Sequence, residues 1–296
     1  MERACSLMFQ STLTHSGKSL FTAAFCRIYS KRGYNVVPFK AQNLSLNSFV
    51  TANGREIAVA QAFQAMACNI KPTEMMNPIL LKPKGEGKVQ VILFGKPYQD
   101  MSFIDYRKYF AIKEGLPRVR EALKGLLDRY DIVIIEGAGT PSELNLMKTD
   151  ISNMRVAEIA DSPVLMIGDI DPGGVFAGLI GTFELLKYRE KNLVKGFIIN
   201  KFRGDQKILE SGIKYLENRT KKRVLGVVPY LEDFFFPAED SITLNITRSH
   251  TQKRNTEKTN VDLDNVRKVW LLNLDKFCNI LGENIDFDYV DQLLGV

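Results

Sequence analysis

Seven short apolar runs place the strongest limit on how this chain can fold. Most of them are continuously apolar rather than alternating, which is typical of strands buried on both faces of a parallel sheet. The expected strands are CSLMF (5–9), NVVPF (35–39), VQVILF (89–94), DIVIIE (131–136), PVLMIG (163–168), GFIIN (196–200) and RVLGVVP (223–229).

Segments with helical periodicity separate these runs. The clearest helix is predicted at residues 19–32 and is followed by Gly33, a favourable helix C-cap. Its apolar stripe comprises Leu20, Ala23, Ala24 and Ile28. Further helices are expected at 55–68, 116–130, 152–160, 175–187 and 206–217. Strands that alternate with helices predict an α/β fold with a doubly wound, mostly parallel sheet.

The alternation stops near residue 240. Residues 1–240 are therefore expected to form one α/β domain. Residues 241–296 hold a polar stretch, the apolar run KVWLLNL (268–274) and an acidic tail. They are too few for a second α/β domain, so we expect a short C-terminal appendage, or the truncated start of another domain.

Composition excludes several classes of protein. The chain has 296 residues, of which 45% are hydrophobic and 25% charged, as in soluble globular proteins. No apolar run reaches the about 18–20 residues of a membrane span, and the N-terminus lacks a signal peptide. We expect a cytoplasmic protein that does not bind membranes. The modest net charge of +6 is better explained by a solvated basic surface than by nucleic-acid binding. The basic run at 247–258 is interpreted as a flexible polar segment.

Cysteine and histidine are too sparse for several kinds of site. The four cysteines lie far apart without a CxxC pair, and the chain has two histidines, His15 and His250. Neither a disulfide framework nor a zinc or histidine-rich metal site is expected.

The segment FQSTLTHSGKSLF (9–21) contains a glycine–lysine–serine triplet between a predicted strand and a predicted helix. In that context backbone N–H groups and the helix N-terminus face a bound phosphate. Lys18 would bridge the β- and γ-phosphates, and Ser19 would hold Mg²⁺. A strict Walker A motif has glycine where Thr12 stands, so a simple strand-to-helix turn is the alternative. The expected nucleotide-binding residues are Thr12, Leu13, Thr14, His15, Ser16, Gly17, Lys18 and Ser19.

Acidic side chains end two other predicted strands. Glu136 ends DIVIIE, at the edge where parallel sheets bind ligands, and could hold Mg²⁺ directly or through water. The alternative is an acid at the surface. Asp169 and Asp171 follow PVLMIG and precede a predicted helix. They would bind metal, orient a polar substrate, or cap that helix.

Polar side chains follow two more strands. PFKAQNLSLNSF (38–49) forms a loop that could bind a carboxylate or phosphate, and within it Gln42, Asn43 and Ser45 are predicted substrate contacts. Lys40 is predicted to be catalytic, together with Lys18 and Glu136. Asn200, in FIINKFRGD (197–205), could read an adenine edge or simply form a turn.

Taken together, the motifs resemble cobyric acid synthase, the glutamine-dependent amidase of cobalamin biosynthesis, whose N-terminal domain is similar to dethiobiotin synthetase. The resemblance runs from about residue 8 to 241. It rests on STLTHSGKS, PFKAQNLSLNSFVT, EIAVAQAFQA, MNPILLKP, IEGAGTPSELNL, DISNMRVAEIADSPVLMIGDIDPGGVFAGLIGT, KGFIINKFRGD and VLGVVPYLED. It implies a P-loop NTPase fold of the dethiobiotin synthetase type.

The resemblance also implies a reaction and a set of ligands. ATP would phosphorylate side-chain carboxylates of adenosylcobyrinic acid a,c-diamide, and ammonia would convert each acyl phosphate to an amide. Mg²⁺ would be held by Ser19, Glu136 and Glu56. Asp169 and Asp171 would join the substrate contacts, and Asn200 the nucleotide contacts. Related synthetases imply a homodimer.

Three departures from the family pattern matter. Ser11 stands where the family has glycine, which would penalise a positive φ at the loop entrance. Pro172 stands where the family usually has arginine. The C-terminal segment lacks a glutaminase signature, because Cys278 lies in KFCNIL rather than Gly-x-Cys-x-Gly, and no Glu partner follows His250 in a His-x-Glu pattern.

Glutamine hydrolysis by this chain is therefore not expected. Ammonia would arrive free or from a separate glutaminase subunit. The alternatives to a synthetase are a ParA- or MinD-like regulatory ATPase and an inactive, truncated remnant.

Overall fold

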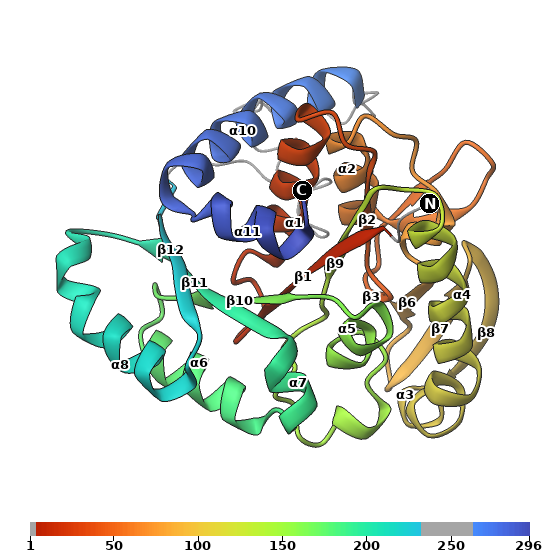
Figure 1. The fold of residues 1–296 in the computed structure, drawn as a ribbon. Helices are drawn as coiled ribbons and strands as arrows, with labels where there is room; N and C mark the ends of the chain where they lie inside the picture. Colours follow the sequence, from red (N-terminus) through yellow and green to blue (C-terminus); the bar gives the residue numbers. More distant parts are fainter. Residues whose placement is uncertain (1–3, 232–262) are drawn as a thin grey trace, which may run out of the picture.

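A six-stranded parallel sheet forms the centre of the molecule (Figure 1). The computed structural model describes residues 4–231 and 263–296. The strand order is β12-β11-β10-β1-β9-β2. Every pairing within this sheet is parallel, so the doubly wound α/β prediction is confirmed. The strands are β1 (Cys5–Ser11), β2 (Val36–Phe39), β9 (Ile132–Glu136), β10 (Val164–Asp169), β11 (Val194–Phe202) and β12 (Arg223–Pro229).

The apolar run VQVILF forms a strand, but the prediction that it joins the parallel sheet is wrong. It is β7 (Lys88–Leu93), which pairs antiparallel with β6 (Ile79–Pro83) and β8 (Lys96–Ser102). The connections 84–87 and 94–95 are too short for the crossover that parallel neighbours need. With β3 (Gln42–Leu44) these strands form a second sheet in the order β3-β6-β7-β8.

A two-stranded antiparallel pair, β4 (Ser48–Val50) and β5 (Glu56–Ala58), lies in the same part of the chain. Because β5 takes the first residues of the helix expected at 55–68, that helix begins later than predicted. It is α2 (Val59–Ala67).

Helices cover both faces of the central sheet (Figure 1). One face carries α1 (Lys18–Lys31), α2, α10 (Leu263–Asn284) and α11 (Phe287–Leu294). The other carries α4 (Leu116–Leu127), α5 (Met154–Ala160), α6 (Val175–Leu185) and α7 (Tyr188–Leu193). Alternate side chains of the strands supply the two cores: Leu7 and Phe9 face α1, and Met8 faces the opposite layer.

Shorter helical elements complete the described chain. Residues 206–217 were predicted as one helix, but they begin with the 3₁₀ turn η4 (Gln206–Leu209), and α8 (Glu210–Thr220) follows it. α8 packs against α6, and α3 (Phe103–Asp105) leads into the π-helix η2 (Tyr106–Gly115). Two further 3₁₀ turns are η1 (Glu74–Met76) and η3 (Met147–Thr149).

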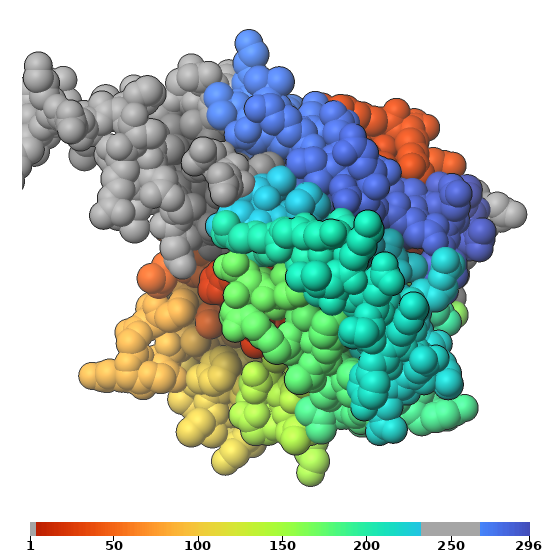
Figure 2. Space-filling model, turned by 90° about the vertical axis from the view of Figure 1, so that its left-hand side faces the viewer, coloured from red at the N-terminus to blue at the C-terminus, as the bar shows by residue number. Residues whose placement is uncertain are grey.

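The C-terminal helices are part of the core rather than a loosely attached appendage. Trp270 and Phe277 of α10 are buried, and their rings pack edge-on against Phe63 and Phe21. In Figure 2 this segment, in blue, lies directly against the turquoise segments at the β12 edge of the sheet. The apolar run at 268–274 therefore completes a layer that α1 and α2 begin.

Ion pairs and hydrogen bonds fasten the same helices to α1. Asp275 lies 2.9 Å from Arg27 and 2.8 Å from Lys31. The Tyr29 hydroxyl donates to Asp291 over 2.6 Å.

Some predictions cannot be compared with the structure. The domain boundary near residue 240, the basic run at 247–258 and His250 all lie outside the described residues. Among the described residues, no helix is both long and apolar enough to cross a membrane.

Candidate nucleotide-binding site

The loop between β1 and α1 is shaped by two residues in the left-handed backbone region. His15 has a φ of 64°, and Gly17, the N-cap of α1, has a φ of 106°. A Cβ atom at Gly17 would come within 2.7 Å of the Asn200 side-chain nitrogen. That nitrogen donates to the Ser16 carbonyl over 2.9 Å. Asn200, predicted to read adenine, therefore supports the loop from β11 in this structure.

Ser11, which stands at the loop entrance, does not have a strained backbone. It is the last residue of β1 and has no positive φ, so the penalty that a positive φ would impose on serine does not arise. Its hydroxyl donates to the Leu13 carbonyl over 2.6 Å and accepts from Lys18 Nζ over 2.6 Å. The serine contributes through its side chain, and the positive φ angles fall later in the loop.

Lys18 is buried, with its ammonium turned into the loop. Besides Ser11 Oγ, Nζ donates to the carbonyls of Leu13, over 3.4 Å, and Gly139, over 2.7 Å. Burial lowers the pKa of Lys18 to about 8, with Glu136 raising it and Lys40 lowering it further. Three acceptors thus surround the ammonium within the loop.

Glu136 is the centre of a buried polar cluster beneath this loop. Its Oε1 accepts from Ser19 Oγ over 2.7 Å and from Lys40 Nζ over 2.8 Å. Its Oε2 accepts from Gln64 over 2.6 Å and from Gln61 over 3.1 Å. Burial alone would raise the pKa of Glu136, but Lys40 and these hydrogen bonds lower it overall. The carboxylate is therefore ionised, and it is 1% exposed, so it is not a surface acid.

The strand register explains why these residues meet. β2 and β9 pair with Phe39 opposite Ile135, so Lys40 and Glu136 follow at adjacent points on one sheet edge. β1 pairs with β9 so that Phe9 lies opposite Glu136. The carboxyl ends of parallel strands thus bring Lys40 and Glu136 below the phosphate loop.

Gln61 and Gln64 were not assigned by the sequence analysis. Both side chains are completely buried on α2. The signal was their i,i+3 spacing in EIAVAQAFQA, which puts two amides on one helix face. Nothing in that spacing identifies their partner, because Glu136 lies 72 and 75 residues further along the chain.

Ser19 and Glu136, two of the three predicted Mg²⁺ ligands, lie in contact with each other. Their oxygen atoms lie 2.7 Å apart at the N-terminus of α1. Mg²⁺ in nucleotide sites commonly takes one or two protein oxygens and fills its shell with phosphates and water. The third predicted ligand, Glu56, is engaged elsewhere: it accepts from Ser48 over 2.8 Å and forms an ion pair with Lys82. The structure does not bring Glu56 into contact with Ser19 or Glu136.

The predicted substrate residues of the loop after β2 have protein partners in this structure. The Gln42 amide oxygen accepts from the Tyr106 hydroxyl over 2.6 Å. Asn43 donates from Nδ2 to Gln61 Oε1 over 3.1 Å. The Ser45 hydroxyl donates to the Asn47 carbonyl over 3.0 Å. Asn43 is buried and therefore connects this loop to the Glu136 cluster.

Asp169 and Asp171 do not cap the helix that follows them. The N-cap of α6 is Gly174, without a side-chain hydrogen bond. Asp169 instead lies 2.5 Å from Lys201 Nζ, which also donates to the His15 carbonyl over 3.1 Å. Asp171 lies 3.5 Å from Arg203. Through Lys201, Asp169 is linked to the phosphate loop.

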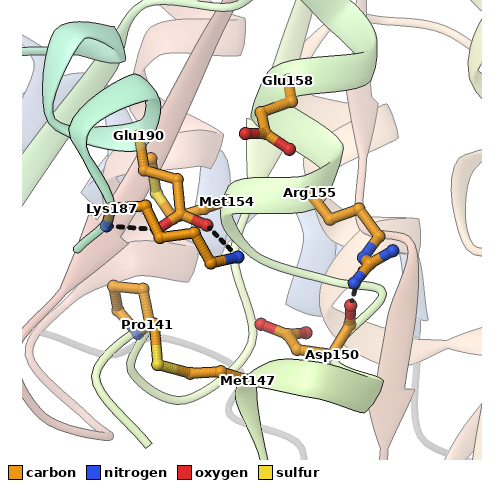
Figure 3. Close-up of a pocket in the computed structure, with 8 residues that line it drawn as sticks. All are labelled: Pro141, Met147, Asp150, Met154, Arg155, Glu158, Lys187 and Glu190. Atoms are coloured by element: carbon orange, nitrogen blue, oxygen red, sulfur yellow. Dashed lines mark hydrogen bonds and ion pairs between the residues drawn. The ribbon is translucent and has the colours of Figure 1, made fainter. Parts of the chain in front are cut away.

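A separate polar pocket of about 230 Å³ lies between η3, α5 and α7 (Figure 3). None of the predicted site residues lines it. Figure 3 shows Lys187 paired with Glu190, and Arg155 donating to the Asp150 backbone carbonyl over 3.1 Å. Its charged side chains are thus largely engaged with neighbouring protein groups.

Cys278 is placed as a structural residue. It lies within α10, buried, with its thiol donating to the Ala24 carbonyl over 3.6 Å. Burial raises the pKa of Cys278 to about 12, which disfavours the nucleophilic thiolate. Cys26 and Cys68 are buried free thiols as well.

These features define the class of protein. A parallel sheet whose first strand leads through a glycine–lysine–serine loop into a buried helix, with an acid at the end of the neighbouring strand, is a P-loop nucleotide-binding fold. The family model described as CobQ/CobB/MinD/ParA nucleotide binding domain matches residues 7–244. The chain belongs to this family.

Curated relatives of the chain include cobyric acid synthases. A probable cobyric acid synthase of Archaeoglobus fulgidus is 54% identical over 241 residues, which cover 81% of this chain and 51% of that protein. The enzyme of Geobacillus sp. is 49% identical over 82% of this chain and 48% of that protein. The enzyme of Desulfitobacterium hafniense is 46% identical over 93% of this chain and 53% of that protein. The chain spans about half the length of the curated relatives it matches.

Proposed function

We propose that this domain catalyses the ATP-dependent amidation of corrinoid side-chain carboxylates, converting adenosylcobyrinic acid a,c-diamide to adenosylcobyric acid in cobalamin biosynthesis. The similarity to cobyric acid synthases supports the substrate class. The observation that carries the proposal is the convergence of Ser19 and Lys40 on one oxygen of Glu136. It joins the first turn of α1 to Lys40, which precedes the segment QNLSLNSF (42–49).

A carboxylate does not react directly with ammonia to form an amide, because oxide would have to leave. Phosphorylation replaces oxide with phosphate, which is a good leaving group. A substrate carboxylate oxygen attacks the γ-phosphorus of ATP, and ADP leaves. Ammonia then attacks the acyl carbon, phosphate leaves, and a proton is lost to give the amide. The protein contributes mainly position and charge.

We assign the charged residues by their places in the site. Lys18 would release Ser11 and Gly139 to bind the β- and γ-phosphates. Lys40 lies at the end of the neighbouring strand and would face the transferred phosphoryl group. Ser19 and Glu136 would hold Mg²⁺, which neutralises phosphate charge when bound.

Ammonia, in this proposal, arrives free or from a separate glutaminase subunit. The buried position and raised pKa of Cys278 support a source outside the described residues. We also propose that the chain forms a homodimer. This part of the proposal is supported by the resemblance to related synthetases alone.

The test uses the full chain with ATP, Mg²⁺, an ammonium salt and adenosylcobyrinic acid a,c-diamide. We expect ADP release and a mass change for each amide formed. Lys18→Met should abolish both, whereas Lys84→Met, which alters an exposed lysine paired with Asp100, should retain both. If the folded chain binds ATP but neither releases ADP nor amidates the corrinoid, the amidation proposal fails. That outcome would favour a ParA- or MinD-like regulatory ATPase or an inactive remnant.

A further inference from the structure

A continuous chain of side-chain hydrogen bonds joins the loop after β2 to the acid at the phosphate loop. Asn43 donates to Gln61 over 3.1 Å, and Gln61 donates to Glu136 Oε2 over 3.1 Å. The Asn43 carbonyl oxygen accepts from the Leu44 backbone over 2.9 Å, which orients its amide. The chain runs through the interior, because all three side chains are at most 4% exposed.

Gln64 donates a second hydrogen bond to Glu136 Oε2 and also contacts the first turn of α1. Its Nε2 donates to Glu136 Oε2 over 2.6 Å and to the Ser19 carbonyl over 3.2 Å. Gln61 also donates to Gln64 Oε1 over 3.3 Å, so the two amides orient one another. Ser19 is thus connected to Glu136 twice, once by its hydroxyl and once through Gln64.

The two oxygens of Glu136 have different kinds of partner. Oε2 receives two neutral amides from α2, while Oε1 receives the hydroxyl and the ammonium. Each carboxylate oxygen thus accepts two hydrogen bonds. A rotation of the carboxylate would therefore break hydrogen bonds to buried amides, and such bonds to a charged group are strong.

We propose that Gln61 and Gln64 are positioning residues that fix Glu136 for the metal–nucleotide complex, and that Asn43, acting through Gln61, couples the substrate loop to that complex. The substrate side of this inference rests on the proposed function. The nucleotide side rests on the hydrogen-bond geometry and on the proposal that Ser19 and Glu136 hold Mg²⁺. Because coupling between two sites is reciprocal, a change at Asn43 alters the Mg²⁺-dependent affinity for nucleotide although Asn43 contacts neither Ser19 nor Glu136.

The first experiment measures binding of a fluorescent ADP analogue to the full chain, with Mg²⁺ and with EDTA. Gln61→Met and Gln64→Met keep similar volume and remove the amide. We expect the gain in affinity that Mg²⁺ brings to fall by about 10- to 100-fold, as for other groups that orient metal ligands. Affinity in EDTA should change far less. Gln10→Met is the matched control, because Gln10 is a buried glutamine whose amide donates to Met8 Sδ rather than to Glu136.

The second experiment tests the path from Asn43. Asn43→Asp keeps the shape of the side chain and removes the donor to Gln61. It is measured alone and combined with Gln61→Met. If Asn43 acts through Gln61, the double variant should match Gln61→Met alone, since residues in one network are not additive. Thermal unfolding of each variant separates loss of fold from loss of metal dependence.

Two results would overturn the inference: an unchanged Mg²⁺ effect in folded Gln64→Met and Gln61→Met, or strictly additive effects of Asn43→Asp and Gln61→Met. Neither measurement uses the corrinoid or ammonia. A failure of the amidation reaction therefore leaves this test intact, and the two proposals can fail independently.

Discussion

The ammonium of Lys40 and the carboxylate of Glu136 lie 2.8 Å apart, with 9% and 1% of their side chains exposed. They end neighbouring strands, so the pairing follows from the sheet register. A buried charge that loses its partner is strongly destabilising, whereas removal of both charges costs much less.

We therefore predict that Lys40→Met lowers the free energy of unfolding by about 3–5 kcal/mol. The double variant Lys40→Met/Glu136→Gln should regain a large part of the lost free energy of unfolding, because neither charge of the pair is then left without its partner. Denaturant unfolding measures both. Lys84→Met breaks an exposed pair with Asp100 and should cost about 0–1 kcal/mol. A double variant no more stable than Lys40→Met would argue against the ion pair as the cause.

A second prediction concerns the glycine at the N-cap of α1. Gly17→Ala combines a φ of 106° with a Cβ atom 2.7 Å from the Asn200 amide. The left-handed backbone costs about 1–2 kcal/mol for alanine, and Asn200 must also release the loop. We expect nucleotide affinity, measured by calorimetry, to fall by about tenfold or more, since 1.4 kcal/mol is a factor of ten.

Gly54→Ala is the control for that prediction. Gly54 has a φ of 74° and open space around its Cα. Its replacement should carry the backbone cost alone and leave nucleotide affinity unchanged. Equal losses of affinity in the two variants would show that the contact with Asn200 is unimportant.

Ser11 offers a test that separates its side chain from its backbone. Removing the hydroxyl takes one of three acceptors from Lys18, so a phosphate competes with fewer partners. We expect Ser11→Ala and Ser11→Gly to raise ATP affinity by a similar amount, about 2- to 13-fold for a net hydrogen bond of about 0.5–1.5 kcal/mol. Titration with ATP measures the change. A much larger gain for glycine than for alanine would show that the backbone at Ser11 is strained after all.

The single tryptophan of the chain, Trp270, lies in α10 and provides a test of how strongly this helix stabilises the fold. Trp270 is fully buried against Phe63. We predict that Trp270→Ala lowers the free energy of unfolding by about 3–5 kcal/mol, as for other large aromatic core residues. Circular dichroism follows unfolding of this variant. Val269→Ala, at a 45% exposed position on the same helix, should cost far less. Comparable losses would contradict a core role for α10.

The contact between α10 and α1 should also depend on pH. Burial opposes ionisation of Asp275, but hydrogen bonds from Arg27 and Lys31 lower its pKa overall. An acid with a lowered pKa stabilises the fold above its unfolded pKa, about 3.9 for aspartate, and that stabilisation is lost as the pH falls through the folded value. The stability difference between the native chain and Asp275→Asn should be constant from neutral pH down to about pH 4 and shrink below it.

Trp270 fluorescence during denaturant unfolding at each pH measures that difference. Lys276→Met, which alters the neighbouring residue without touching the Arg27–Asp275 pair, is the control. A difference that stays constant at the lowest pH would show that the ion pair does not stabilise the contact.

The parallel sheet could be predicted because its strands are long apolar runs with crossovers between them. β7 could not be placed, because VQVILF has the same local composition and its sheet is decided by two short connections. The place of α10 was also missed. Phe21 and Phe25 lie outside the predicted stripe of α1, yet both are buried, and this second apolar face was the available indication of a further layer.

Some residues of the candidate site could likewise be predicted from the sequence, whereas others could not. Lys18, Ser19, Lys40 and Glu136 lie at or after the carboxyl ends of β1, β2 and β9, and parallel strands place those ends at one edge. Gln61 and Gln64 reach that edge from the middle of a helix, so their role depends on the packing of α2. Glu56 is engaged by Lys82 because β5 interrupts the predicted helix and directs this residue toward the smaller sheets.

The position of α1 between the sheet and α10 has a mechanical consequence. A helix with the sheet on one side and a second helix on the other cannot slide or tilt without disturbing both contacts. Any rearrangement that accompanies phosphate binding must then be absorbed within residues 12–17. We therefore expect the C-terminal helices, by packing against α1, to limit how far that helix moves when phosphate binds.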